Sequence, residues 1–228
     1  LVINLGEALE ILQKASGGSP WDSKRRTGER EFSSKSSQAK VDKRIEADTE
    51  VQATLLDQTE ALTVFTDGAC ESNGRDTALA GYGVYFHSST GIESISRPLE
   101  GEIQTNQRAE MMAVISALDV LLALNQTQND GASLVSPVLI LSDSRYTVTG
   151  IKEWVPNWKK NNWQTSNRNP VKNKDLWVRL DKSLTNLRRL RPVELRWVKG
   201  HSGNPGNEKA DQLAVRGIHM QRLTPLRR

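Results

Sequence analysis

The distribution of apolar and polar residues divides the chain near residue 61. Residues 62–228 alternate short apolar runs with polar turns, whereas residues 16–43 are rich in Ser, Gly, Lys, Arg and Glu and contain few apolar side chains. Such a polar segment cannot offset the entropy lost on ordering. We therefore expect residues 1–61 to be a polar, largely disordered tail or linker. Residues 62–228 should form one folded domain, with a core from about 62 to 217 and a short basic C-terminal tail.

Five short segments within this domain predict strands. The expected strands are Leu62–Thr66, Gly81–Phe86, Glu93–Pro98, Pro137–Leu141 and Val193–Val198. The short links between the first three indicate an antiparallel meander. The fully apolar fourth run is typical of a central strand that is covered on both faces.

Apolar residues at helical spacing predict helices between and after these strands. The expected helices run from Thr105 to about Asn125, Ser144–Gly150, near Trp154–Lys160, Asn173–Arg189 and Gly206–Gly217. Three strands, a helix, a strand, further helices, a strand and a helix together indicate the α/β class. The expected architecture is a mixed sheet with helices on both faces.

Composition excludes several classes of protein. The longest purely apolar runs, Val120–Leu124 and Val138–Leu141, are far too short to span a membrane. The single cysteine, Cys70, excludes an internal disulfide framework and indicates a reducing, intracellular compartment. Because the chain begins with Leu1 rather than Met, we expect it to be a fragment or a processed form.

A modest overall charge hides a basic block. The net charge is +4, but residues 151–200 alone carry 13 Lys and Arg against 4 Asp and Glu. Such a block favours a polyanionic partner, or it forms a solvated helical face. Three of the six tryptophans lie in residues 154–163, around Lys159 and Lys160. Trp beside Lys suits nucleic acid, although Trp154 and Trp158 are also spaced to pack against each other.

Two acidic residues follow predicted strands. Asp67 lies at the expected C-terminal end of the first strand, and Asp143 at that of the apolar strand Val138–Leu141. Functional sites in open α/β sheets gather beyond these strand ends. Alternatively, Asp67 is a turn residue and Asp143 caps the next helix.

Two further acidic residues lie on predicted helices, each at the head of an apolar stripe. Glu110 precedes Ala113, Val114 and Ala117 at helical spacing, and Asp211 precedes Ala214, Val215 and Ile218. A carboxylate on a core-facing stripe is costly unless it is compensated, or it reaches water at the rim. If all four acids converge, either their pKa values rise or cations bind, and oxygen ligands suit Mg²⁺ or Mn²⁺.

A glycine-rich loop over residues 199–208 joins the last strand to the last helix. It contains His201, which changes protonation near neutral pH and could move protons at a neighbouring site. A loop histidine can equally be an ordinary surface residue.

Sequence blocks between Leu62 and Gly217, roughly two thirds of the chain, occur together in one enzyme family. The blocks are Phe65–Gly68, Ala80–Tyr85, Thr105–Glu110, Ser142–Ser144, Trp197–Gly203 and Asn207–Asp211. Their order and the ten-residue step from His201 to Asp211 resemble type 1 ribonuclease H of the cellular, eukaryotic-like kind. The resemblance implies the ribonuclease H-like fold, with a five-stranded sheet of three antiparallel and two parallel strands.

The resemblance also implies a reaction, namely endonucleolytic hydrolysis of the RNA strand of RNA–DNA hybrids that leaves 5′-phosphomonoesters. Two Mg²⁺ ions, for which Mn²⁺ can substitute, would activate the water and stabilise the departing 3′ oxygen. The metal ligands implied by the matching motifs are Asp67, Glu110, Asp143 and Asp211. His201 would aid proton transfer or product release.

Further residues match positions at which this family contacts the hybrid. Those implied in the minor groove, where RNA 2′-hydroxyls distinguish the strands, are Asn73, Asn106 and Gln107. Those implied on the DNA side are Thr105, Ser166 and Asn173. The aromatic part of the DNA channel would contain Tyr146 and Trp154. The segment Trp158–Trp163, with Lys159 and Lys160, resembles the family's basic protrusion. Ile103 departs from the arginine that the closest eukaryotic relatives carry in the phosphate pocket.

Two alternatives share this fold. One is a non-catalytic hybrid-binding module, against which the four intact acids argue. The other is a related nuclease domain from a retroelement, which would share the chemistry; the His201 loop and Asp211 argue against an integrase core. We expect a monomer that acts on an RNA–DNA hybrid away from membranes. The sequence distinguishes neither nucleus, mitochondrion nor cytoplasm, and it indicates no protein partner.

Overall fold

A five-stranded sheet organises the residues that the computed structural model describes, which are 61–127 and 136–223. The strands are β1 (Leu62–Glu71), β2 (Leu79–Phe86), β3 (Ile95–Pro98), β4 (Val138–Ser142) and β5 (Val193–Trp197). Their order across the sheet is β3-β2-β1-β4-β5. The polar tail expected before the domain lies outside the described residues, except for Ala61.

The sheet is mixed in the way the sequence predicts. Strands β1, β2 and β3 pair antiparallel, whereas β1, β4 and β5 pair parallel. Ile140 and Leu141 are neighbours on β4 and point to opposite faces of the sheet, and both are buried, as expected for a strand that is covered on both faces.

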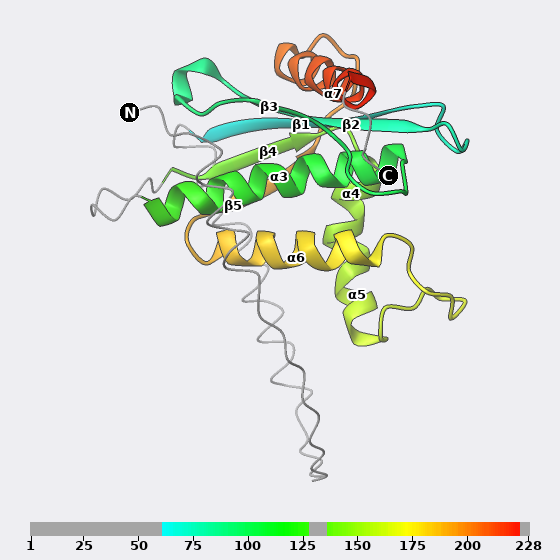
Figure 1. Cartoon of the computed structure of the whole chain (residues 1–228). Coiled ribbons are helices and arrows are strands. Elements are labelled where there is room, and N and C mark those ends of the chain that lie inside the picture. The colour runs from blue at the N-terminus through cyan, green and yellow to red at the C-terminus, as the bar shows by residue number, and fades with distance from the viewer. Residues whose placement is uncertain (1–60, 128–135, 224–228) are drawn as a thin grey trace, which may run out of the picture.

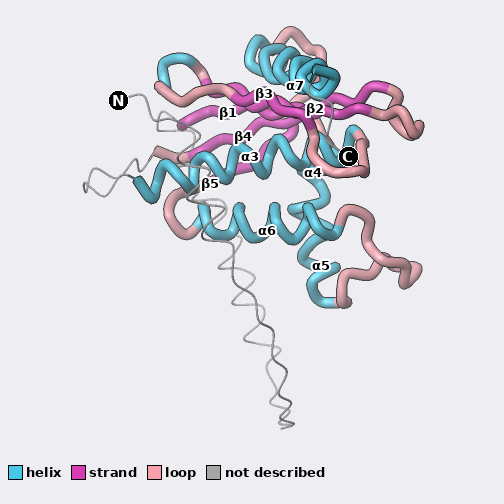
Figure 2. The backbone as a smooth tube through the Cα atoms, in the orientation of Figure 1, coloured by secondary structure: helices cyan, strands magenta, loops and turns pink. Residues whose placement is uncertain are grey.

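Helices cover both faces of the sheet (Figures 1 and 2). The main helices are α3 (Asn106–Thr127), α6 (Lys174–Arg188) and α7 (Pro205–Leu223). Helix α7 packs on β1, β2 and β3 from one side, while α3 packs on β1 and β2 from the other and carries α6 on its outer side. The core between sheet and helices includes the fully buried Val114, Leu118 and Trp177.

The expected end of the first strand is wrong. The first strand was expected to end at Thr66, with Asp67 as a possible turn residue, but β1 continues to Glu71 because β2 pairs with it from Val64 to Glu71. Asp67 pairs opposite Gly83, and Glu71 pairs opposite Leu79. Pairing with β2 therefore overrides the preference of the Asp67–Gly68 pair for a turn.

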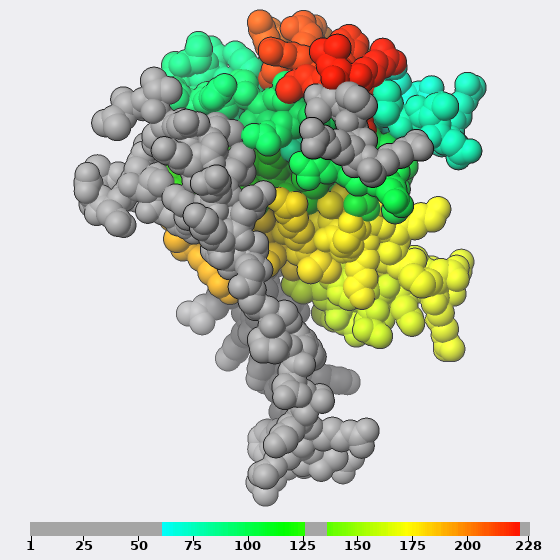
Figure 3. All heavy atoms as spheres, viewed as in Figure 1, coloured from blue at the N-terminus to red at the C-terminus, as the bar shows by residue number. Residues whose placement is uncertain are grey.

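The helical region after β4 is more continuous than the sequence indicates. Helix α4 (Arg145–Thr149) runs through a π-helical segment (Gly150–Trp154) into α5 (Val155–Lys160). Figure 3 shows α5 and the following loop extending from the body of the domain. Ser144 caps α4, so Asp143 is not the cap residue.

The C-terminal helix also exceeds its expected length. Helix α7 extends past the predicted end at Gly217 to Leu223, so the folded core extends further than expected. Its predicted stripe is partly wrong, since Ala214 and Ile218 are buried but Val215 is 37% exposed. No helix within residues 61–127 and 136–223 is long and apolar enough to cross a membrane.

Candidate active site

Asp67 and Asp143 are brought together by the parallel pairing of β1 with β4. The last paired residues of these strands are Thr66 and Ser142, and each acid follows directly. Beyond this pair, β1 continues along β2 while the chain after β4 turns into α4. The separation of two parallel neighbours leaves a gap at the carboxyl end of β4, where α/β folds place their sites.

Glu110 reaches this gap because α3 lies unusually close to β1. A Cβ on Gly68 would lie 2.2 Å from the backbone nitrogen of Glu110, which no real side chain tolerates. Glycine at this position therefore lets the first turn of α3 contact the strand immediately beside Asp67.

Asp211 arrives from the opposite face on α7. A Cβ on Gly83 would lie 2.3 Å from the carbonyl oxygen of Ala210, so α7 also lies directly on the strand. Gly83 is the residue paired with Asp67. The sheet thus holds α7 with Asp211 next to the strand position of Asp67.

The four acids and His201 line one cavity of about 340 Å³. Its remaining lining comes from residues 68–70 and Asn106. The structure thus brings together the five residues to which the family resemblance assigns catalytic roles. His201 is exposed and has a left-handed backbone, with φ of 49°, in the loop between β5 and α7.

The electrostatics of the cavity disfavour its negative charges. Burial first, and then the Asp143 carboxylate, raise the pKa of Asp67 to about 8, although a hydrogen bond from the Gly68 backbone N–H opposes this. The Asp211 and Glu110 carboxylates raise it further. Asp67 is only 8% exposed, so water offsets little of this cost.

The environment of Glu110 also disfavours its ionised form. Burial raises its pKa, and hydrogen bonds donated by the Ser144 hydroxyl and the Asn106 amide oppose the shift. The Asn106 bond is 2.8 Å long. The nearby Asp143 carboxylate raises the pKa of Glu110 as well.

The donor set fits divalent cations. Four carboxylates around one cavity offer the hard oxygen ligands that Mg²⁺ and Mn²⁺ prefer, and a cation would remove their mutual repulsion. As the side chains stand, no group of three His, Cys, Asp or Glu in the described ranges is arranged to hold an ion. Both oxygens of Glu110 accept hydrogen bonds from Ser144 and Asn106 in this arrangement.

A second cavity of about 500 Å³ adjoins the first and shares Glu110, Asp143 and Asn106 with it. We call it the groove. Its other lining residues are Asn73, Thr105, Gln107, Ser144, Arg145 and Tyr146. Five of the positions expected to contact a hybrid, namely Asn73, Thr105, Asn106, Gln107 and Tyr146, therefore share one surface beside the acids.

Comparison with known proteins matches nearly the same residues as the folded domain described above. A sequence model of the RNase H family matches residues 59–219. The chain belongs to the RNase H family. Ribonuclease HI of Pseudomonas aeruginosa is 41% identical over 162 residues, which are 70% of this chain and 94% of that relative. Ribonuclease H of Schizosaccharomyces pombe is 44% identical over 154 residues, which are 68% of this chain and 52% of that relative.

A solved structure supports the fold. The PFV RNase H domain, determined in solution, superposes with a TM-score of 0.50 at 23% identity, over 70% of this chain and 94% of that domain. The predicted RNase H fold and the prediction of a ribonuclease H are both confirmed by these comparisons. Enzymes of this family depend on divalent metal ions.

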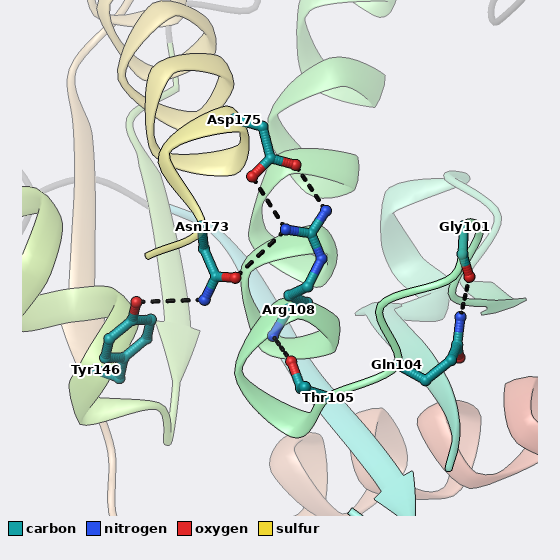
Figure 4. Close-up of polar contacts among 7 residues, drawn as sticks. All are labelled: Gly101, Gln104, Thr105, Arg108, Tyr146, Asn173 and Asp175. Carbon is teal, nitrogen blue, oxygen red and sulfur yellow. Dashed lines mark hydrogen bonds and ion pairs between the residues drawn. The ribbon is translucent and has the colours of Figure 1, made fainter. Parts of the chain in front are cut away.

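In this RNase H domain, a polar network fixes Asn173 at the start of α6 (Figure 4). Arg108 of α3 donates to both carboxylate oxygens of Asp175, at 3.0 and 2.6 Å, and to Asn173 Oδ1 at 3.3 Å. The Asn173 amide in turn donates to the Tyr146 hydroxyl at 3.4 Å. The hydrogen bonds and the charge of Arg108 lower the pKa of Asp175. The bonds to Arg108 and Tyr146 determine which end of the Asn173 side chain faces Tyr146.

Gln104 holds the loop that precedes α3. Its amide donates to the carbonyls of Leu99 and Gly101, and its oxygen accepts from the Ala80 N–H. These contacts tie the loop to β2, and Thr105, whose hydroxyl accepts from the Arg108 N–H, follows directly. Ile103 in this loop is 61% exposed and, unlike the arginine that the resemblance led us to expect, is uncharged.

The tryptophans expected near the substrate mainly pack on one another. Trp154 and Trp158 lie 5.7 Å apart between ring centroids, and both contact the buried Trp177. Tyr146 joins this cluster through Trp154 and Trp177. The packing alternative is confirmed for these two residues, and neither lines the groove.

The basic protrusion is exposed but partly neutralised. Lys159 forms an ion pair with Asp181 of α6 at 2.7 Å, whereas Lys160 and Ser166 are exposed. None of these three residues lines either cavity. Their expected contacts with nucleic acid remain predictions.

Several residues of the site received no role from sequence alone. The Asn207 amide donates to Asp143 Oδ2 at 3.3 Å, and the Trp197 indole donates to the Asp143 carbonyl at 2.9 Å. Ser144 donates to Glu110, and Arg145 lines the groove. All four lie inside or directly beside the sequence blocks that carry the family resemblance, and that position was the only signal for them in the sequence. Their contacts join residues far apart in the chain, which the spacing of residues cannot reveal.

Proposed function

We propose that this domain hydrolyses the RNA strand of RNA–DNA hybrids endonucleolytically and leaves 5′-phosphomonoesters. The observation that carries the proposal is the shared cavity of Asp67, Glu110, Asp143 and Asp211, which opens beside a groove of hydrogen-bonding side chains. A relative that is 41% identical over 94% of its own length is a ribonuclease HI.

The four acids would hold two Mg²⁺ ions, for which Mn²⁺ can substitute. Such a pair supplies an activated water and charge stabilisation for the departing 3′ oxygen. Asp67 and Asp143 are fixed by adjacent strands, and Glu110 and Asp211 by helices on opposite faces, so the ligands are held by rigid elements. The raised pKa values of Asp67 and Glu110 mark the electrostatic cost that bound cations would relieve.

His201 would move protons at the leaving group or assist product release. It lines the cavity from an exposed loop rather than from the sheet, so its imidazole reaches both the acids and solvent. A group so placed suits proton transfer after the substrate has been positioned.

The groove would receive the hybrid. Asn73, Asn106 and Gln107 offer amide donors and acceptors, which suit the minor-groove edge and the 2′-hydroxyls of the RNA strand. Two of these residues are already in contact, because the backbone N–H of Asn106 donates a hydrogen bond to Asn73 Oδ1 at 3.3 Å. Thr105 and the oriented Asn173 would contact the DNA strand, with Lys160 and Ser166 on the outlying protrusion.

A monomer suffices for this reaction, because every acid and every groove residue comes from one chain. The alternative of a non-catalytic hybrid-binding module is disfavoured because all four acids are present and converge. Origin in a retroelement would leave the proposed chemistry unchanged, and the PFV domain shares the fold.

The test is a comparison of three labelled duplexes of identical sequence, namely an RNA–DNA hybrid, duplex DNA and duplex RNA. With Mg²⁺, only the RNA strand of the hybrid should be cut, and the new ends should accept no phosphate from a 5′ kinase until a phosphatase has acted. Cleavage of either homoduplex at a similar rate, or equal cleavage in EDTA, contradicts the proposal.

A further inference from the structure

Arg145 is an exposed cation in the wall of the groove. It is the first residue of α4 and lies two positions after Asp143. Asp143, Glu110 and Tyr146 line the same groove. A positive charge therefore lies within the surface that the proposed substrate would cover.

The Arg145 guanidinium is stacked on Trp197. Its Cζ lies 4.2 Å from the centroid of the indole ring. Trp197 is itself fixed, because it pairs with Ser142 across β4 and β5 and donates its indole N–H to the Asp143 carbonyl at 2.9 Å. The sheet that places Asp143 thus also holds the platform under Arg145.

The contact with the Trp197 ring does not use up the N–H donors of the guanidinium, which has five. The Arg145 side chain forms no hydrogen bond and no ion pair with any residue in the described ranges, even though two carboxylates line the same groove. Arg108 differs, because both terminal nitrogens of its guanidinium donate hydrogen bonds to the Asp175 carboxylate. An oriented guanidinium with unused N–H groups is suited to bidentate contact with a phosphate.

We infer that Arg145 binds a backbone phosphate of the hybrid beside the four acids, with Trp197 as the platform that orients it. The inference rests on the proposed function, because it takes the occupant of the groove to be a nucleic acid. A phosphodiester fits the position in charge and geometry, and stacking lowers the entropy lost when the guanidinium is immobilised.

Binding of a labelled hybrid tests this inference, with Asp211→Asn as the inactive parent because Asp211 does not line the groove. Arg145→Gln, Arg145→Lys and the control Arg216→Gln are added to this parent; Arg216 is exposed on α7 and lines neither cavity. Loss of one phosphate contact should reduce the slope of log affinity against log salt by about 0.7 to 0.9 in Arg145→Gln. Arg145→Lys and Arg216→Gln should keep the parent's slope.

Hybrids in which single phosphates are replaced by neutral methylphosphonates then locate the contact. One replacement should weaken binding by the parent and by Arg145→Lys but leave Arg145→Gln unaffected. If Arg145→Gln keeps the parent's slope and responds to every replacement as the parent does, the inference is wrong. If Arg145→Lys and Arg145→Gln behave alike, Arg145 acts through packing on Trp197 and the inference is also wrong.

The proposed function can fail separately. If the wild-type protein does not cut hybrids and the parent does not bind them, the function is wrong. If the wild type cuts and the parent binds, but Arg145→Gln shows neither change, only the role of Arg145 is wrong.

Discussion

The Asn207 amide holds the Asp143 carboxylate across 64 residues of sequence, through a hydrogen bond of 3.3 Å. Asn207 is 3% exposed, and its other polar atom, Oδ1, has no hydrogen-bond partner among the described residues. The buried amide donates to the carboxylate of Asp143 and so restricts its orientation, as contacts behind a metal ligand do.

Asn207→Ala should therefore impair the metal site without removing a ligand. We expect the Mg²⁺ concentration for half-maximal cleavage to rise by about 10- to 100-fold, the usual effect of losing such an outer contact. Cleavage rates over a Mg²⁺ titration measure this shift. Asn157→Ala, at an exposed amide on α5, is the control and should leave the titration unchanged.

Asp67→Asn should stabilise the metal-free protein at alkaline pH. Because the folded-state pKa of Asp67 is raised from 3.8 to about 8, the folded state keeps a proton that the unfolded state loses. Stability therefore falls as pH rises from about 4 to 8. Asp67→Asn removes this fall, so its melting temperature in EDTA should exceed that of the wild type at pH 8.5 by several degrees and by much less at pH 4.

Melting curves at both pH values in EDTA test this prediction. Asp76→Asn, at an exposed loop position, is the matched control and should follow the wild type. A wild-type melting temperature that does not fall more steeply with pH than that of Asp67→Asn would contradict the electrostatic description of the cavity.

His201→Ala should slow turnover less than loss of any of the four acids. The imidazole lies in an exposed loop and is not needed to hold the acids, so hybrid affinity should change little. Single-turnover rates and binding isotherms separate the two effects, with His219→Ala on α7 as the control. A His201→Ala protein as inactive as Asp143→Asn would assign the histidine to metal binding or to folding.

Arg108→Leu should weaken hybrid binding through Asn173. Without Arg108, Asn173 Oδ1 loses its donor and the amide can rotate away from its present orientation. We expect KM to rise severalfold, with a smaller fall in kcat. Arg179→Leu is the control, because Arg179 also forms an ion pair with a carboxylate, that of Asp119, away from the groove. Exposed pairs contribute about 0–1 kcal/mol to stability, so equal effects of the two variants would indicate a merely structural role for Arg108.

Much of this site could be predicted from sequence because its residues lie in local blocks. The antiparallel meander of the first three strands follows from link lengths, and the positions of Glu110 and Asp211 on the core-facing stripes follow from helical spacing. Asp67 shows where local signals fail. Its Asp-Gly pair favours a turn, yet pairing with β2 extends the strand, and only the tertiary partner decides the outcome.

The contacts that orient the site could not be predicted. Trp197 contacts Asp143 over 54 residues of sequence, and Arg145 depends on the same indole, so their roles arise only when β4 and β5 pair. The expected substrate role of Trp154 and Trp158 was equally undecidable, because a spacing of four residues fits both packing and binding. Their contacts with the buried Trp177 come from α6.

The most direct test of the account is the single-turnover rate at which wild type and Asp143→Asn cut the RNA strand of a labelled hybrid in Mg²⁺. Asp143 follows β4 and lines the cavity together with the other three acids, so we expect its neutral analogue to keep the fold but to lose a ligand. We expect Mg²⁺-dependent cleavage by the wild type and a rate lower by at least about 1,000-fold in Asp143→Asn, a barrier increase of about 4 kcal/mol. Cleavage by Asp143→Asn at a rate near that of the wild type would contradict it.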